Sequence, residues 1–316
     1  MDQRYPLGFG RYAPSPSGDL HLGNLRTALL AWAFARRDGL GFHMRVENLD
    51  ERSRLHFAKR QLEDVETLGI DWDGPVAYQS ENVARYQEVF AELARADAVY
   101  ECYCTRRELA DVVNAPHRPP GAYAGTCRNL TDDQRGAGRA KVAALHRGVA
   151  YRLRSEVDEL TVTDRQLGDY TGVVDDFVVR RGDGIFAYNF AAIVDDADAG
   201  VTQVVRGDDL LPSTPRQVYM QQVLGVSTPQ YAHVPLVLNT AGQRLAKRDG
   251  AVTLRELGEL GWSPADIVQL LAVSLGMTPV RSAAEFLEVF DPVELPREPW
   301  KLDVEGLKDG PGAYFS

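Results

Sequence analysis

The amino-acid sequence predicts an α/β protein, and three observations support this fold class. Short apolar runs alternate with helix-like stretches over the first 100 residues, and a repeated order of strand and helix is typical of α/β folds. From about Tyr100 the pattern changes to β-rich polar segments, which indicates an insertion between two halves of one α/β domain. The 316 residues are enough for about two domains of roughly 150 residues or for one large core.

The first elements follow from apolar periodicity. In chain order we expect a strand that ends at Arg11, a Pro/Gly/Ser-rich turn at 13–18, a helix in LGNLRTALLAWAFARRDG, a strand in GFHMRVEN, and polar helices at about 54–68 and 83–95. Arg36 and Arg37 suit the negative end of the first helix dipole, and Gly39 is a suitable stop.

The middle of the chain is expected to be rich in strands. A Pro/Gly loop at 114–125 precedes three segments that we interpret as β-rich, AYRLRSEV, GVVDDFVVRR and IFAYNFAAIVDD. Strand and loop patterns resume at GVTQVVRGDDLL, QYAHVPLVLN and RLAKRDG, and helices alternate with loops from about Val252. The expected division is a first half of the α/β domain at 1–99, an insertion at 100–186, a second half at 187–250 and a helical region at 251–316.

Composition and charge restrict the classes of function. Hydrophobic residues make up 44% and charged residues 25%, and no run approaches the ~18 apolar residues of a membrane span, so a membrane protein is not expected. The start of the chain, MDQRYPLGFG, lacks a secretion signal, which favours a cytoplasmic location. The net charge of −10 argues against a nucleic-acid partner on that sum alone, although a local basic face can still bind a polyanion.

The three cysteines form one group in the sequence. Cys102, Cys104 and Cys127 are an odd number in a chain without a secretion signal, which argues against a disulfide framework. Three thiolates are instead typical of a zinc site, which needs a fourth ligand. By position His117 or Tyr123 can supply it, and spacing favours His117 because imidazole is the commoner ligand. The alternative is a set of three buried structural thiols.

The strongest functional pattern is GRYAPSPSGDLHLGNLRTAL. His21 and Asn24 at a helix start place two polar side chains and free backbone amides on one face, which predicts a site for nucleotide phosphates. Gly23 removes a side chain where a flat purine ring would approach the backbone. The alternative is a helix-capping turn with a surface histidine.

The same residues resemble a known family. RYAPSPSG-x-LHLGN resembles the first signature of class I aminoacyl-tRNA synthetases, in their glutamyl and glutaminyl branch, and RLAKRDG lies where the second, lysine-bearing signature would fall. MRVENLD, AYNFA and VVRGDDLL-x-STPRQ extend the resemblance over residues 9–250. It implies a Rossmann-type parallel-sheet catalytic domain with a zinc-bearing insertion and a short C-terminal helical region.

The resemblance also implies the site residues. Lys247 matches the catalytic lysine, whose ammonium can stabilise charge on the departing pyrophosphate; without the resemblance it would be taken for a solvated lysine. Two guanidinium groups, two hydroxyls and a carboxylate would bind L-glutamate: Arg11, Arg206, Ser15, Tyr188 and Glu47. Two positions depart from the family pattern, Ala246 in place of serine and Asn48 in place of an acid.

The implied reaction is ATP-dependent activation of glutamate followed by transfer to tRNA, with magnesium accompanying ATP. Only 66 residues follow Gly250, too few for an anticodon-binding domain, so we expect a truncated branch that attaches glutamate to queuosine in the anticodon loop of tRNA(Asp). That branch resembles this chain in having a tyrosine four residues before the last cysteine, which selects Tyr123 as the fourth ligand of one zinc. Neither DNA nor a membrane is an expected partner.

Three alternatives stay open. A nucleotidyltransferase of the same superfamily would share HLGN and the lysine loop but would not need the glutamate-binding set. An ordinary glutamyl-tRNA synthetase would charge the 3′ end of tRNA. A catalytically impaired paralogue that binds glutamate or tRNA is suggested by Ala246 and Asn48.

Overall fold

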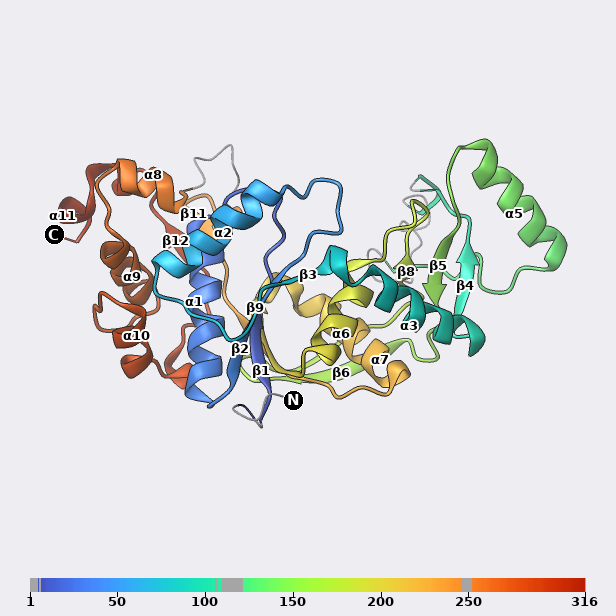
Figure 1. The fold of residues 1–316 in the computed structure, drawn as a ribbon, viewed down its shortest axis with the longest axis horizontal. Coiled ribbons are helices and arrows are strands. Elements are labelled where there is room, and N and C mark those ends of the chain that lie inside the picture. Colours follow the sequence, from blue (N-terminus) through green and yellow to red (C-terminus); the bar gives the residue numbers. More distant parts are fainter. Residues whose placement is uncertain (1–4, 6, 106, 110–121, 246–251, 316) are drawn as a thin grey trace.

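The computed structural model describes residues 5, 7–105, 107–109, 122–245 and 252–315 (Figure 1). Its main feature is a seven-stranded sheet in the order β3-β2-β1-β9-β10-β6-β7, in which only the final pair is antiparallel. The strands are β1 (Phe9–Tyr12), β2 (Gly41–Val46), β3 (Ala77–Tyr78), β6 (Glu159–Asp164), β7 (Gly168–Val173), β9 (Val201–Gly207) and β10 (Gln230–Val234). The predicted α/β class is therefore confirmed.

Three helices connect parallel strands of this sheet: α1 (Leu22–Arg37) joins β1 to β2, α2 (Leu55–Thr67) joins β2 to β3, and α7 (Thr214–Leu224) joins β9 to β10. α6 (Tyr188–Asp198) precedes β9 and packs against it, and α3 (Val83–Arg95) packs on α6. α1 is buried along most of its length because it packs against β1 and β9 on one side and α10 (Ala283–Val289) on another. The bounds of α1, α2 and α3 agree with the helices expected from apolar periodicity.

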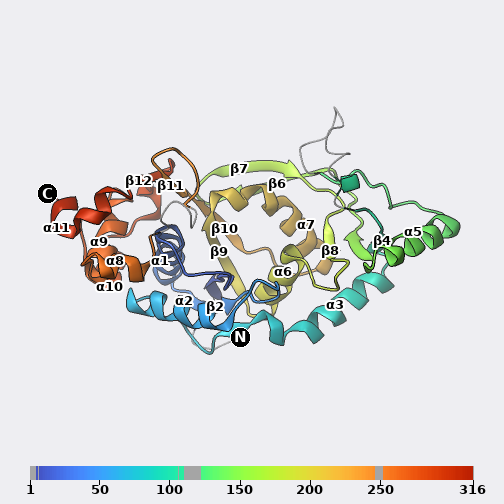
Figure 2. The ribbon, with the colours of Figure 1, turned by 90° about the horizontal axis from the view of Figure 1, so that it is seen from above.

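A smaller sheet lies at the end of the molecule opposite the C-terminal helices (Figures 1 and 2). Its antiparallel strands are β4 (Val99–Cys102), β5 (Ala150–Leu153) and β8 (Val178–Arg180), and α5 (Asp132–Ala144) lies beside it. The cluster Tyr100, Cys102, Tyr103, Tyr123, Cys127 and Val142 gives this region a small core of its own.

The C-terminal region is mostly helical. It contains α8 (Leu254–Glu259), α9 (Pro264–Val273), α10 and α11 (Pro311–Tyr314). One short strand, β12 (Trp300–Leu302), pairs in parallel with β11 (Val237–Asn239), which follows β10 in the chain, and the two form a separate two-stranded sheet. None of the helices in the described parts of the chain is long and apolar enough to cross a bilayer.

Two segments differ from the sequence prediction. IFAYNFAAIVDD was expected to be β-rich, and this is wrong because it contains α6. Its continuous apolar run reflects a helix buried on most sides, which periodicity alone does not distinguish from a buried strand. β6 and β7 lie within the expected insertion at 100–186 but extend the main sheet. The four-part division of the chain stays a prediction.

Candidate active site and metal centre

The turn that begins α1 brings His21 and Asn24 together as predicted. His21 caps the helix: its Nδ1 accepts a hydrogen bond from the amide of Gly23 at 3.1 Å, and the Asn24 side chain accepts one from the His21 amide at 3.2 Å. Burial lowers the pKa of His21, so the ring is neutral near pH 7. With Nδ1 accepting, the ring proton resides on Nε2, which remains a donor. The turn is thus a cap that also presents a polar face.

A cavity of about 310 Å³ opens beside this turn. Its lining includes six of the predicted residues, Arg11, His21, Gly23, Asn24, Tyr188 and Arg206. Arg11 and Arg206 lie near the carboxyl ends of β1 and β9, which are adjacent in the sheet although β2 pairs with the other edge of β1. This is the point where the strand order reverses, and open α/β sheets bind ligands there.

A second cavity, of about 300 Å³, contains the other predicted glutamate ligands. Ser15, Glu47 and Tyr188 line it, together with Gln79 and Arg181. Tyr188, at the start of α6, lines both cavities, so the two adjoin at its side chain. The five residues expected to bind glutamate therefore line two cavities that share Tyr188.

A buried network of charges lies beneath these cavities. Arg45 pairs with Asp196 at 2.5 Å, with Glu47 at 3.2 Å and with Asp195 at 3.6 Å. Arg11 lies 3.6 Å from Asp196 as well. Arg45, Arg11 and Arg206 together lower the pKa of Asp196 against the effect of its burial, so three guanidinium groups and three carboxylates share this region. Glu47 has only Arg45 as an ion-pair partner among the described residues, and Arg45 is shared with Asp195 and Asp196, so an ammonium group placed at Glu47 would add a cation of its own.

The environment of Glu47 compensates its negative charge only in part. Burial raises the pKa of Glu47, and Arg45 and Arg11 oppose the rise without cancelling it. Arg45 compensates Glu47 only in part because it is shared with Asp195 and Asp196. A bound cation would favour the ionised carboxylate.

Several residues in this region were not predicted as site residues. Arg45 and Asp195 hold Glu47 in place, and Asp195 in turn accepts hydrogen bonds from Tyr86 at 2.7 Å and Gln79 at 2.8 Å. Arg45 lies within MRVENLD, two positions before Glu47, so the alternation of a strand could have placed both side chains on one face. Nothing local in the sequence indicates that Tyr86 reaches Asp195.

Lys247 and Ala246 lie outside the described residues, but both flanks of their segment adjoin the site. Before it, Arg244 and Leu245 line the first cavity, and Arg244 pairs with Asp209 at 2.7 Å. After it, the carbonyl of Val252 accepts a hydrogen bond from the amide of Leu22 at 3.0 Å.

Asn48, the second departure from the family pattern, makes two hydrogen bonds with Ser80. Its Nδ2 donates to the Ser80 hydroxyl at 2.8 Å, and its Oδ1 accepts from the Ser80 amide at 2.9 Å. An acid at this position could make only the second of these as a carboxylate. Asn48 is therefore fitted to its neighbour and does not line either cavity.

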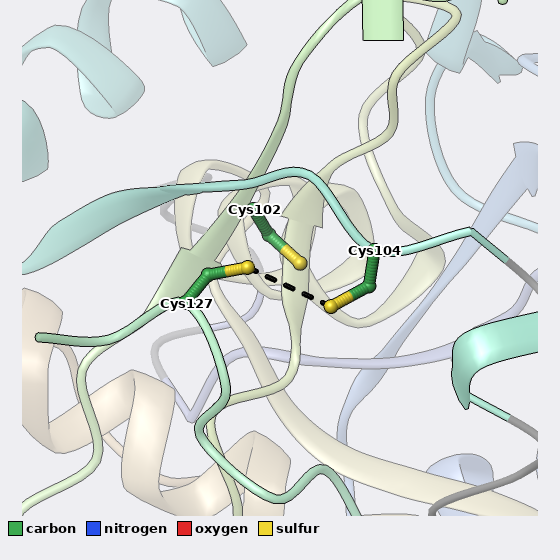
Figure 3. A group of neighbouring side chains, drawn as sticks. All are labelled: Cys102, Cys104 and Cys127. Carbon is green, nitrogen blue, oxygen red and sulfur yellow. Dashed lines mark hydrogen bonds between the residues drawn. The ribbon is translucent and has the colours of Figure 1, made fainter. Parts of the chain in front are cut away.

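The three cysteines converge at the end of β4 (Figure 3). Their sulfur atoms lie within 4.8 Å of one another, and Cys104 and Cys127 are 3.6 Å apart. The Tyr123 hydroxyl lies 3.6 Å from the sulfur of Cys102 and 3.7 Å from that of Cys104. Tyr123 therefore lies beside the cysteines as predicted, whereas His117 is outside the described residues.

The Cys104–Cys127 separation and the two Tyr123–cysteine separations match a tetrahedral zinc site. With Zn–S bonds of about 2.3 Å and a Zn–O bond of about 2.0 Å, tetrahedral ligands lie about 3.8 Å apart for two sulfurs and about 3.5 Å apart for sulfur and oxygen. Arg152 donates from Nε to the Cys102 sulfur at 3.2 Å, and its guanidinium lies 3.6 Å from the centre of the Tyr123 ring. Three cysteine sulfurs and one oxygen atom so placed are a donor set that fits zinc.

Comparisons with known proteins agree with the sequence motifs. A family model described as tRNA synthetases class I (E and Q), catalytic domain, matches residues 9–307. The chain is 58% identical over 300 residues to a glutamyl-Q tRNA(Asp) synthetase of Nocardia farcinica, covering 95% of this chain and 94% of that protein. A protein of the same name from Symbiobacterium thermophilum is 43% identical over 320 residues, covering 94% and 97%.

A solved structure shows the same architecture. The glutamate tRNA ligase of Elizabethkingia meningosepticum, in complex with its amino acid, matches with a TM-score of 0.76 at 26% identity. The match covers 94% of this chain and 67% of that one.

Proposed function

Because the chain belongs to the class I tRNA synthetases of the glutamate and glutamine group, and is therefore a ligase, we propose that it activates L-glutamate with ATP and transfers it to queuosine in the anticodon loop of tRNA(Asp). The observation that carries the glutamate assignment is the pair of cavities that share Tyr188 in their lining. Arg11 and Arg206 lie in one, and Glu47 lies in the other, where its partner Arg45 is shared with two further carboxylates. A ligand with two carboxylates and one ammonium complements this arrangement.

In the activation step the α-carboxylate of glutamate attacks the α-phosphorus of ATP, and pyrophosphate leaves. Nε2 of His21, the Asn24 side chain and the first amides of α1 face the phosphates, where the positive end of the helix dipole also lies. Lys247 stabilises the charge on the departing pyrophosphate. No side-chain nucleophile is needed, so the protein contributes position and electrostatics. Magnesium, as the counterion of ATP, supplies further charge neutralisation when bound.

In the transfer step a hydroxyl of the acceptor attacks the mixed anhydride and AMP leaves. The choice of queuosine in tRNA(Asp) is supported by the relatives in Nocardia and Symbiobacterium, whose names specify that product and which this chain matches across 94% and 97% of their lengths. Bases of a single-stranded loop can be splayed out toward a protein site. We place the enzyme in the cytoplasm, where its tRNA partner is found.

The proposed metal is one zinc ion, held by Cys102, Cys104, Tyr123 and Cys127. Its support is the set of separations described above and the neighbouring guanidinium of Arg152. These ligands are four residues of the small sheet and its loops, so the metal would cross-link segments that have few other core residues.

The acceptor decides between this proposal and an ordinary synthetase. Radiolabelled glutamate, ATP and enzyme are incubated with tRNA(Asp) that carries queuosine, and the product is digested with nuclease. We expect the label on the anticodon fragment and none on the matched unmodified transcript. Label on the terminal adenosine, or equal labelling of the unmodified transcript, would contradict the assignment of queuosine.

The activation step is tested separately by pyrophosphate exchange without tRNA. We expect exchange with glutamate and none with aspartate or glutamine. Lys247→Ala should lower the rate about 100-fold or more, as when a charge contact to a transition state is removed. Lys59→Ala is the matched control, because Lys59 is 80% exposed on α2 and pairs only with Glu63 among the described residues. Absence of exchange with every amino acid would favour a binding paralogue.

A further inference from the structure

Arg206 is fixed by a chain of buried side chains from neighbouring strands. In the parallel register of β9 and β10, Arg206 lies beside His233. Asp164 ends β6, which pairs with the other edge of β10. The side chains of His233 and Asp164 have no exposed surface, and neither residue lines the cavity that Arg206 lines.

The hydrogen bonds of this chain define the tautomer of His233. Nε of Arg206 donates to Nε2 of His233 at 3.0 Å. Since an arginine Nε always carries its proton, Nε2 must be the unprotonated nitrogen. Nδ1 therefore carries the ring proton and donates it to Oδ2 of Asp164 at 2.6 Å. Burial also keeps the pKa of His233 below its ordinary value, which favours this neutral ring.

The back of the Arg206 guanidinium is held at a second point. Nη2 donates to the Thr214 hydroxyl at 2.9 Å, and that hydroxyl lies 3.2 Å from Nε2 of His233. The guanidinium lies 5.2 Å from the centre of the Tyr231 ring. Among the described residues Nη1 makes no hydrogen bond, so this nitrogen is free to bind a ligand in the cavity.

The orientation of Asp164 is fixed in turn. Its Oδ1 accepts hydrogen bonds from the amides of Gln166 and Leu167, both at 3.0 Å. The amide of His233 is shared between Oδ1 at 3.2 Å and Oδ2 at 3.1 Å. Oδ1 thus accepts only from backbone amides, and Oδ2 accepts from the imidazole and the amide of His233. The carboxylate can rotate to no other position without losing these bonds.

We propose that His233 and Asp164 are positioning residues, which hold Arg206 in the orientation that binds a carboxylate of the amino-acid substrate. The inference rests on the proposed function, because it takes glutamate as the ligand of Arg206. It predicts a specific defect, weaker binding of glutamate with unchanged binding of ATP.

Two substitutions of His233 separate its two hydrogen bonds. In His233→Gln the amide oxygen can occupy the place of Nε2 and accept from Arg206, but the donor to Asp164 is lost. In His233→Asn the shorter side chain can still donate to Asp164 but does not reach Arg206. We expect the KM for glutamate to stay within about 3-fold of wild type in His233→Gln and to rise roughly 10- to 100-fold in His233→Asn. The KM for ATP should change in neither.

Asp164→Asn tests the tautomer. The backbone amides that bond Oδ1 require an acceptor there, so the new side chain must direct its NH₂ group at Nδ1 of His233. The ring proton would then move to Nε2, where it opposes the Nε–H of Arg206. We expect the KM for glutamate to rise about 10-fold. In the His233→Gln background, Asp164→Asn should change the KM for glutamate little further. The glutamine side chain has no second tautomer, so its oxygen can still accept from Arg206 whatever stands at position 164.

The outcomes are distinguishable. If wild-type protein exchanges pyrophosphate with no amino acid, the proposed function is wrong. If it exchanges pyrophosphate with glutamate, two results would each show that the positioning role is wrong. One is the same KM for glutamate in His233→Gln and His233→Asn. The other is an equal rise in the KM for glutamate when Asp164→Asn is made in wild type and in His233→Gln. Met220→Ala, a truncation of a fully buried side chain on α7, is the control for general loosening and should leave the KM for glutamate unchanged. Thermal unfolding of every variant shows which ones are folded. If His233→Asn does not fold, the result for Asp164→Asn decides whether the positioning role holds.

Discussion

Glu47 illustrates how one side chain depends on its surroundings. It is 7% exposed, and burial raises its pKa above the ordinary 4.5 despite the neighbouring Arg45. Only the ionised carboxylate can bind the ammonium of glutamate. Protonation weakens that binding, so affinity is complete above the raised pKa and is lost as the pH falls through it.

We therefore expect the KM for glutamate to rise as the pH falls through a range that lies above 4.5, the ordinary pKa of a glutamate side chain. The measurement is pyrophosphate exchange at varied glutamate across this range. Glu47→Gln should have a higher KM with no such rise. A steep rise that persists in Glu47→Gln would assign the titration to another group.

Tyr123 is the residue on which the zinc prediction depends most. Its hydroxyl lies near two cysteine sulfurs, so Tyr123→Phe removes an oxygen ligand and should reduce zinc retention from about one ion per chain after dialysis. Tyr103→Phe is a matched control, because the Tyr103 hydroxyl in the same small core bonds to Glu101 instead. Elemental analysis measures both, and loss of zinc in His117→Ala but not in Tyr123→Phe would reverse the choice of ligand.

At the same scale, the sequence predicts the residues of the site better than the contacts that hold them. Arg11, His21 and Glu47 are found from motifs because each lies in a short segment of characteristic residues. The partners of Arg206 are not found in this way: Asp164 and His233 are 69 positions apart and meet only when β6 and β10 pair. Such contacts follow from the order of strands in the sheet, which no local pattern specifies.

At the scale of elements, α1 was predictable because capping, periodicity and a stop signal agree. α6 was not, because a helix buried on most sides has lost its polar face. α5 was also missed, since its sequence contains Gly136 and Gly138 and few apolar residues. A glycine in a sequence does not show by itself whether its segment is helical, because its effect depends on the atoms around it.

Gly23 is one turn position that requires glycine for reasons of space. A Cβ atom there would lie 2.9 Å from Cε1 of His21 and 3.0 Å from its Nδ1, so the imidazole must move. In Gly23→Ala the gain in helix propensity, about 1 kcal/mol, offsets a lost cap of about 1 kcal/mol. We expect the unfolding temperature to change little while the KM for ATP rises roughly 10-fold, through displacement of His21.

Gly136→Ala is the matched control for this substitution. Gly136 lies within α5 with nothing within 4 Å of its would-be Cβ, so alanine should stabilise the helix by up to about 1 kcal/mol and leave the KM for ATP unchanged. Thermal unfolding and exchange kinetics measure both variants. An unchanged KM for ATP in Gly23→Ala would show that His21 does not contact the nucleotide.

At the scale of the whole molecule, charge is unevenly distributed. The net charge is −10, yet a hollow of about 690 Å³ beside Cys104 is lined by Arg107, His146, Arg147 and Arg181, with Asp183 as its only acid among the described residues. This hollow lies at the small sheet, which is at the end of the molecule away from the C-terminal helices (Figure 2), and more of its lining residues are basic than acidic.

This distribution predicts that the two steps of the reaction differ in their need for zinc. Adenylate formation uses small molecules in two cavities, one lined mainly by β1, α1 and β9 and the other by the loops that follow β1 and β2 and precede α6. The metal ligands belong to a separate core cluster. Removal of zinc with a chelator, or by Cys127→Ser, should loosen the small sheet and displace its basic hollow. We expect pyrophosphate exchange to stay within about 3-fold of the holoprotein while transfer to tRNA falls more than about 10-fold.

The comparison is made on one preparation, with and without restored zinc, by exchange and by labelling of tRNA(Asp) that carries queuosine. Recovery of transfer on adding zinc shows that the loss is reversible, and Cys127→Ser should not recover because a ligand is missing. Arg181, which lines both the basic hollow and the cavity of Glu47, is the residue through which a change in the small sheet would reach the active site. If exchange and transfer are lost in equal proportion, the metal supports the catalytic cavities through this connection and is not specific to the tRNA step.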